Sequence, residues 1–281
     1  MNRRALVLGG GGITGIAWEV GLLAGLAAEG LDLTAADLVL GTSAGSVVGA
    51  QITSGRSLED LYAAQLAGYG AEVAARMPRR ALARFAVAVL TTRDGGRFRQ
   101  RVGRLAVGAR TMPEAERLAV IAARLPSAEW PDADLRVTVV DAETGELRVL
   151  DRASGVPLVQ AVAASCAVPG VYPPITLSGR RYIDGGVRSG TNADLAAGYG
   201  RVVVLAPLAR GIGPMTGVPE HLAQLRATAS VTAVSPDAAA VAAIGRNVLD
   251  PARRAGAARA GRAQAGAVVG EVSAVWTGPI I

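Results

Sequence analysis

The sequence has almost no histidine or cysteine, two side chains that many enzymes use for acid–base, nucleophilic or metal chemistry. It contains one histidine, His221, and one cysteine, Cys166, and all 29 of its basic residues are arginine. A single cysteine excludes an intramolecular disulfide and is typical of a reducing compartment. One histidine and one cysteine do not make a zinc site. Any general base must therefore be His221 or a carboxylate.

Long apolar runs and aromatic residues are also scarce. No run approaches the roughly 18 apolar residues of a membrane-spanning helix. The apolar stretch at residues 5–8 is too short for a signal-peptide core. Aromatic residues make up only 4% of the chain, although its net charge is +6, and nucleic-acid binding needs basic residues beside stacking aromatics. We therefore expect a cytoplasmic protein that binds no nucleic acid. No pattern indicates an oligomeric state.

Short buried strands alternate with helices along the sequence. Strands are predicted at residues 4–8, 38–40, 135–141, 147–150 and 202–205, and the part from Val218 onward is predicted to be mostly helical. This alternation predicts an α/β layered fold with a largely parallel sheet. A chain of 281 residues can bury one large core. We expect a single domain over residues 1–281, with a helical, arginine-rich insertion at about 71–130 and a helical tail after about 250.

The first candidate for chemistry is the pentapeptide Gly41-Thr42-Ser43-Ala44-Gly45, which follows a predicted strand and precedes a helix of small residues. In a G-x-S-x-G turn the serine lies at a sharp strand-to-helix corner, and side chains in place of the glycines would clash with neighbouring backbone. The pentapeptide alone is weak evidence for a nucleophilic serine, but its position between a predicted strand and a predicted helix supports that interpretation. We predict that Ser43 is a nucleophile. The competing interpretation is a tight turn whose serine caps the helix.

The second candidate is the glycine run at residues 9–12, between the first strand and the first helix. Free amides and the dipole at a helix N-terminus bind anions, and in acyl transfer that anion is the tetrahedral oxyanion. Gly10, Gly12 and Gly15 also fit the dinucleotide-binding pattern G-x-G-x-x-G, but no acidic residue closes the second strand. The candidate oxyanion donors are the amides of Gly10, Gly11, Gly12, Ile13 and Ala44.

Asp184 is the third candidate, because it ends a predicted strand and precedes two glycines that let the backbone bend. An Asx turn is the alternative role. An ordinary aspartate, with a pKa of about 3.9, is a weak base for a hydroxyl, so we expect partial burial to raise that pKa. His221 is the rival base, since Ser43, Asp184 and His221 follow the order of an α/β-hydrolase triad. Its position at the start of a predicted helix favours a solvent-exposed histidine instead.

These residues resemble the motifs of the patatin-like phospholipases. The resemblance implies a three-layer α/β/α sandwich with a mostly parallel sheet, and a lipid acyl hydrolase that uses a Ser43–Asp184 dyad, forms an acyl-enzyme and needs no cofactor. One departure is Thr14, where the family often has a basic residue. Cys166 is interpreted as a packed core residue. The motifs are, in the family's order, Gly10-Gly11-Gly12-Ile13-Thr14-Gly15, Gly41-Thr42-Ser43-Ala44-Gly45, Ala164-Ser165-Cys166-Ala167-Val168-Pro169 and Asp184-Gly185-Gly186.

Nine arginines lie between Arg76 and Arg104, inside the expected insertion. A helix with this pattern can lie at a membrane interface, with cations on anionic head groups, or it can pack its apolar stripe against the sheet. The expected partners are a lipid or ester substrate and, as a hypothesis, a membrane surface contacted through the Arg76–Arg104 region. A non-catalytic nucleotide- or lipid-binding module is the alternative to an enzyme. The two faces of the helix consist of Arg76, Arg80 and Arg84, and of Leu82, Phe85 and Val89.

Overall fold

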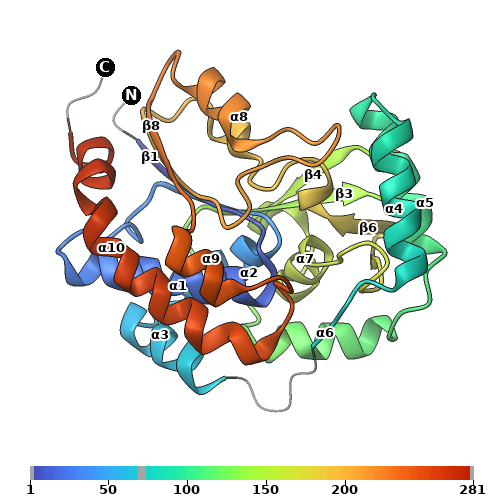
Figure 1. Cartoon of the computed structure of the whole chain (residues 1–281), viewed down its shortest axis with the longest axis horizontal. Helices are drawn as coiled ribbons and strands as arrows, with labels where there is room; N and C mark the ends of the chain where they lie inside the picture. Colours follow the sequence, from blue (N-terminus) through green and yellow to red (C-terminus); the bar gives the residue numbers. More distant parts are fainter. Residues whose placement is uncertain (1–2, 69–73, 279–281) are drawn as a thin grey trace.

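The computed structural model describes residues 3–68 and 74–278. Within these ranges an eight-stranded mixed sheet lies between two layers of helices, which confirms the α/β fold (Figure 1). The strands are β1 (Arg4–Leu8), β2 (Leu38–Gly41), β3 (Leu135–Asp141), β4 (Leu147–Leu150), β5 (Ile175–Leu177), β6 (Arg180–Asp184), β7 (Arg201–Leu205) and β8 (Ser230–Val234).

The sheet has the order β5-β6-β3-β2-β1-β7-β8, with β4 paired to β3. The pairs among β3, β2, β1, β7 and β8 are parallel. The pairs that involve β4, β5 and β6 are antiparallel. Parallel neighbours place their carboxyl ends on one edge, so the turns after β1 and β2 emerge side by side. This is the edge at which ligands bind in open α/β sheets.

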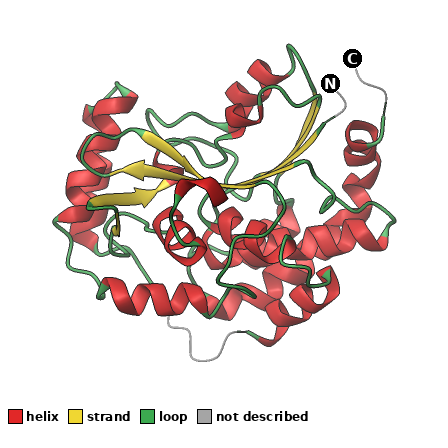
Figure 2. Cartoon of the chain, turned by 180° about the vertical axis from the view of Figure 1, so that it is seen from behind, coloured by secondary structure: helices red, strands yellow, loops and turns green. Residues whose placement is uncertain are grey.

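The helices cover both faces of the sheet. In Figure 1, α1, α2, α7 and α10 lie below the sheet, α8 lies above it, and α4 and α5 stand at its right-hand end; Figure 2 shows the same layers from behind. No helix of the described residues is both long and apolar enough to cross a membrane. The bounds are α1 (Gly12–Ala28), α2 (Ala44–Ile52), α3 (Leu58–Ala67), α4 (Arg79–Thr91), α5 (Gly95–Val107), α6 (Glu114–Ala122), α7 (Leu158–Ser165), α8 (Val218–Leu225), α9 (Ala238–Ile244) and α10 (Arg254–Trp276).

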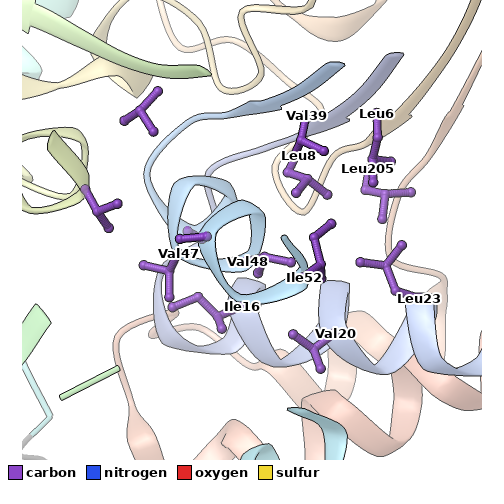
Figure 3. Packing of buried hydrophobic residues seen from close by; sticks show 14 of the residues in the cluster. Leu6, Leu8, Ile16, Val20, Leu23, Val39, Val47, Val48, Ile52 and Leu205 are labelled. Carbon is purple, nitrogen blue, oxygen red and sulfur yellow. The ribbon is translucent and has the colours of Figure 1, made fainter. Parts of the chain in front are cut away.

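The main core forms because alternate strand residues point to opposite faces of the sheet. Leu6 and Leu8 of β1 point towards α1 and α2, whereas Ala5 and Val7 belong to the core on the other face. Figure 3 shows side chains of the strands meeting those of the two helices. Each fully buried side chain of this size contributes roughly 1.5–3 kcal/mol. This packing therefore fixes the positions of the ends of β1 and β2 and of the turns that follow them.

Helix α1 is apolar on nearly all sides because α10 covers the face that the sheet leaves open. The two helices approach closely at glycines: a Cβ on Gly21 would overlap the Ala258 carbonyl, and one on Gly261 would overlap the Trp18 carbonyl. This packing fixes α1, whose N-terminus carries the glycine run.

One part of the sequence folded differently from the predicted pattern. Strand β8 lies in the part predicted to be mostly helical, between α8 and α9. The segment at about 71–130 contains α4, α5 and α6, and residues 69–73 lie outside the described ranges. The predicted tail after about 250 contains α10.

Candidate active site

Ser43 occupies a strained corner between β2 and α2. Its backbone angles are φ 53° and ψ −115°, a conformation that costs a non-glycine residue about 1–3 kcal/mol. The two flanking positions have no room for a side chain. A Cβ on Gly45 would overlap the Leu8 carbonyl, and one on Gly41 would lie 2.5 Å from the Ser46 Cα. The predicted elbow geometry is therefore present, and the Ser43 side chain does not cap the helix.

Three hydrogen bonds with side chains hold the Ser43 backbone in this conformation. Its N–H donates to the Ser165 Oγ at 2.9 Å. Its carbonyl accepts from the Ser46 Oγ at 2.7 Å and from the Cys166 Sγ at 3.2 Å. Cys166 is buried, and burial raises the pKa of its thiol, which agrees with a packed residue rather than a nucleophile.

The Ser43 hydroxyl donates a hydrogen bond of 2.7 Å to the Asp184 Oδ2. The other carboxylate oxygen, Oδ1, accepts from the Gly186 N–H at 2.7 Å. Both side chains are almost buried, with residue exposures of 7% for Ser43 and 5% for Asp184. The turn after Asp184 needs glycine, because a Cβ on Gly185 would overlap the Thr138 hydroxyl. The structure thus brings together a hydroxyl and a carboxylate 141 residues apart in the chain.

Burial raises the pKa of Asp184 to about 6. Three favourable interactions limit the rise: the hydrogen bond from Ser43, the hydrogen bond from the Gly186 amide, and the positive charge of Arg117. A carboxylate with this pKa is ionised at pH 7 yet accepts a proton more readily than an exposed aspartate.

The glycine run presents unused amides beside Ser43. Within residues 3–68 and 74–278, the N–H groups of Gly11, Gly12, Ile13 and Ala44 donate no hydrogen bond, as expected of the first residues of helices. Gly12 has φ +62°, a conformation that favours glycine. Gly10 differs from the prediction, because its N–H donates to the Gly190 carbonyl at 2.7 Å. Gly10 is therefore not free to bind an oxyanion.

Asn192 connects the two turns that carry Ser43 and Asp184. It is fully buried, and its side-chain amide lies 3.1 Å from the Thr42 hydroxyl, 3.3 Å from the Thr138 hydroxyl and 3.2 Å from the Gly185 carbonyl. Its backbone is left-handed, with φ 50°, and its side chain forms no helix cap. This connecting role is one that the sequence analysis missed.

An apolar cavity of about 230 Å³ opens above Ser43 and Asp184. Its walls are mostly hydrocarbon side chains, among them residues of α4, of the loop after β7 and of the segment before α10; the charged residues of the lining are Asp184 and Arg210. A lining of this kind accommodates an apolar chain. Its apolar side chains are those of Met77, Phe85, Val168, Pro169, Val187, Leu208, Ile212, Met215, Val248 and Leu249.

His221 is buried, contrary to the prediction of a solvent-exposed side chain. It is 2% exposed, and its Nε2 lies 3.2 Å from the Asp194 Oδ1. Asp194 is also bound by Arg188 at 2.6 Å. Burial lowers the pKa of His221, and the Asp194 charge opposes that shift. The histidine is buried because α8 packs on the short helix η3 (Ala193–Ala196), which follows Asn192.

Arg117 is a residue of the site that the sequence interpretation missed. It lies on α6, is 2% exposed, and stacks on Tyr172 with its Cζ 3.6 Å from the ring centroid. Its Nη2 donates to the Cys166 carbonyl at 3.3 Å. A signal was available: Arg117 and the buried Ile121 are four residues apart, so an arginine lies on the apolar face of the helix.

Comparison with known proteins places the chain in a family. A sequence model of the patatin-like phospholipases matches residues 6–197, more than half of the chain. The protein belongs to the patatin-like phospholipase family, which implies lipid acyl hydrolase activity.

Two solved structures are also similar to this chain, at low sequence identity. VipD from Legionella pneumophila is 15% identical with a TM-score of 0.48, and the match covers 96% of this chain and 67% of VipD. The type III effector protein ExoU is 15% identical with a TM-score of 0.41, and the match covers 96% of this chain and 53% of ExoU.

Proposed function

We propose that the protein is a serine lipid acyl hydrolase of phospholipase A or esterase type that uses Ser43 and Asp184 as a dyad. The observation that carries the proposal is the 2.7 Å hydrogen bond from the Ser43 Oγ to the Asp184 Oδ2. The bond lies at the base of an apolar cavity and beside unused backbone amides. Nucleophile, base, oxyanion donors and space for an acyl chain are the parts that acyl transfer requires.

In the first half-reaction, Ser43 transfers its hydroxyl proton to Asp184 while its Oγ bonds to the ester carbonyl carbon. The carbonyl electron pair moves to oxygen, and the amides of Gly11, Gly12, Ile13 and Ala44 surround that oxyanion. Collapse of the tetrahedral intermediate breaks the bond to the leaving alcohol, which takes the proton from Asp184. The acyl group is then bonded to Ser43.

In the second half-reaction, water attacks the acyl-enzyme and gives its proton to Asp184. The new tetrahedral intermediate expels the Ser43 Oγ, which recovers the proton from Asp184, and the fatty acid leaves. The dyad needs no histidine, because the Ser43 hydroxyl contacts the carboxylate directly. This contact leaves no place for an imidazole between the two groups, which weighs against a triad through His221.

Turnover of a chromogenic short-chain ester tests the proposal. We expect wild-type activity, a loss of at least about 1,000-fold in Ser43→Ala, and full activity in the matched control Ser54→Ala, which changes a serine just beyond the other end of α2. A folded wild-type protein without turnover would contradict the enzyme and support the non-catalytic binding module.

We also propose that the protein acts in the cytoplasm and contacts a membrane through the α4 side. The apolar residues of α4 are divided between two faces: Phe85 and Val89 pack inward, whereas Leu82 is 55% exposed and Leu90 is 81% exposed. The loop that lines the cavity adds Ile212, which is 53% exposed. Exposed apolar residues beside arginines are typical of interfacial helices.

Pelleting with anionic phospholipid vesicles tests this contact. The exposed arginines of α4 are Arg79, Arg80 and Arg84, and we expect their joint replacement by glutamine to reduce vesicle binding at low salt. The matched control replaces three exposed arginines on other elements, Arg226, Arg253 and Arg259, and it should bind as the wild type does. Binding that ignores both salt and the α4 arginines would contradict the proposal.

A further inference from the structure

A second cavity, of about 20 Å³, borders Ser43. Gly12 and Ser43 line both this cavity and the large apolar one, so the two adjoin at the nucleophile. A water molecule needs roughly 10–15 Å³ of such volume. The second cavity therefore has room for about one oxygen atom and is too small for a phosphate group.

The lining of the small cavity is suited to a negative charge. Gly12, Ile13 and Ala44 are part of this lining, and their backbone amides donate no hydrogen bond within the described residues. Two buried arginines, Arg117 and Arg124, also line it, and Arg117 is the more deeply buried of the two, at 2% exposure against 7%. If the acyl chain lies in the large cavity, a carbonyl carbon bonded to the Ser43 Oγ can direct its oxygen into the small one.

Arg117 is a buried cation without a carboxylate partner. Among residues 3–68 and 74–278, no acidic group forms an ion pair with it, and its Nε has no hydrogen-bond partner. Its contacts are one carbonyl, that of Cys166, and the ring of Tyr172. The charge of Asp184 acts on Arg117 through space but not through a direct ion pair, so the buried guanidinium is only partly compensated. A negative charge that develops next to it during the reaction would add to this compensation.

The glycine run itself brings no positive side chain. Thr14 is fully buried, its N–H donates to the Val248 carbonyl at 3.1 Å, and its hydroxyl lies 3.3 Å from the same oxygen. Any fixed positive charge next to the unused amides must therefore come from another part of the chain. Helix α6 brings Arg117 to this position.

We propose that Arg117 is a further residue of the acyl-transfer site and stabilises the oxyanion that forms between the amides of Gly12, Ile13 and Ala44. The inference rests on the proposed function, because it needs Ser43 to attack a carbonyl. As the Ser43 Oγ–carbon bond forms, the carbonyl electron pair becomes a full negative charge on oxygen. A guanidinium fixed beforehand in a water-poor site stabilises that charge without reorganisation.

A purely structural role for Arg117 is the competing explanation, since it anchors the Cys166 carbonyl beneath the Ser43 turn. The two roles differ in what they change. A structural anchor affects the melting temperature. An electrostatic residue affects kcat more than KM, and it also changes the pH dependence of kcat, because the guanidinium lowers the pKa of Asp184.

The first experiment compares Arg117→Met with Arg201→Met on an uncharged p-nitrophenyl ester. Arg201 is the matched control: it is 8% exposed, its Nε also lacks a partner among the described residues, and it lies at the start of β7, away from the glycine run. We expect Arg117→Met to lower kcat by about 100-fold, as loss of an oxyanion donor does, with KM little changed and the acid limb of kcat moved to higher pH. Arg201→Met should leave both kcat and the limb unchanged.

A second variant distinguishes oxyanion stabilisation from a structural role even where Arg117→Met fails to fold. Arg117→Lys keeps the charge, but a buried lysine loses its proton at lower pH than an arginine. We expect kcat of this variant to fall on the alkaline side, where wild type stays level. An alkaline profile identical to wild type, or a folded Arg117→Met with kcat within threefold of wild type, would overturn the inference. Wild-type protein without ester turnover would instead contradict the proposed function.

Discussion

Two aspartates ten positions apart show how surroundings assign different roles to the same side chain. Asp184 is buried, accepts hydrogen bonds from the neutral groups Ser43 and Gly186, and has its pKa raised to about 6. Asp194 has a side chain that is 23% exposed and binds Arg188 and His221. Burial alone would raise the pKa of Asp194, but the hydrogen bonds and charge of Arg188, together with His221, lower it. One carboxylate can act as a base, and the other is an anchor.

Replacement of each aspartate by asparagine gives the largest expected contrast. Asparagine at 184 can keep both hydrogen bonds, with its oxygen towards the Gly186 N–H and its NH₂ towards Ser43, but it cannot take the serine proton. We expect Asp184→Asn to lower kcat by at least about 1,000-fold, whereas Asp194→Asn stays within about threefold of wild type. If both variants fold and lose kcat to a similar extent, the assignment of Asp184 as the base and Asp194 as an anchor is contradicted.

The pH dependence of stability should also separate Asp184 from its asparagine variant. The folded protein holds the Asp184 proton more tightly than the unfolded chain does, with a pKa of about 6 against 3.8. The free energy of unfolding therefore falls as pH rises through this window, by at most about 3 kcal/mol. We expect Asp184→Asn to lack that fall, in urea denaturation at pH 4, 5, 6 and 7. Parallel curves for the two proteins would contradict a raised pKa.

Asp194 should show the opposite sign. Its pKa is lowered on folding, so its contribution to stability is present above the unfolded pKa and is lost as the pH falls through the lower, folded value. We expect Asp194→Asn to be about 1–2 kcal/mol less stable than wild type at pH 7, with the difference shrinking in acid. Thermal melts of both proteins at neutral and acidic pH measure this, and an unchanged melting temperature at pH 7 would count against the anchor role.

The smallest expected effect on catalysis is that of the histidine. His221 contacts Asp194 and not Asp184, so His221→Gln should retain ester turnover within about twofold, with at most a modest loss of stability. A His221→Gln protein that melts like wild type but has lost turnover would revive the triad.

Local patterns predicted most of the candidate site because its residues lie on turns. The Ser43 corner, the glycine run and the Asp184 turn each depend on glycines that neighbouring backbone makes necessary, and such glycines are visible in the sequence. Strand alternation likewise predicted the α/β fold, since the strands lie in a buried sheet.

The remaining features depend on packing between distant segments. Arg117 reaches the site only because α6 packs on α7, and His221 is buried only because α8 covers η3. Gly10 uses its amide on the Gly190 carbonyl, a partner 180 residues away that no local pattern indicates. Strand β8 is a short run between helical segments, and its pairing with β7 decides its conformation.

Mapped labelling with a fluorophosphonate probe tests the central claim most directly. We predict a single adduct on Ser43 in wild-type protein, at a rate that rises with pH through about 6 as Asp184 loses its proton, and no adduct in Ser43→Ala. Labelling of Asp184→Asn should be slower by orders of magnitude. An adduct on another residue, or labelling of Asp184→Asn at the wild-type rate, would contradict a nucleophile activated by that carboxylate.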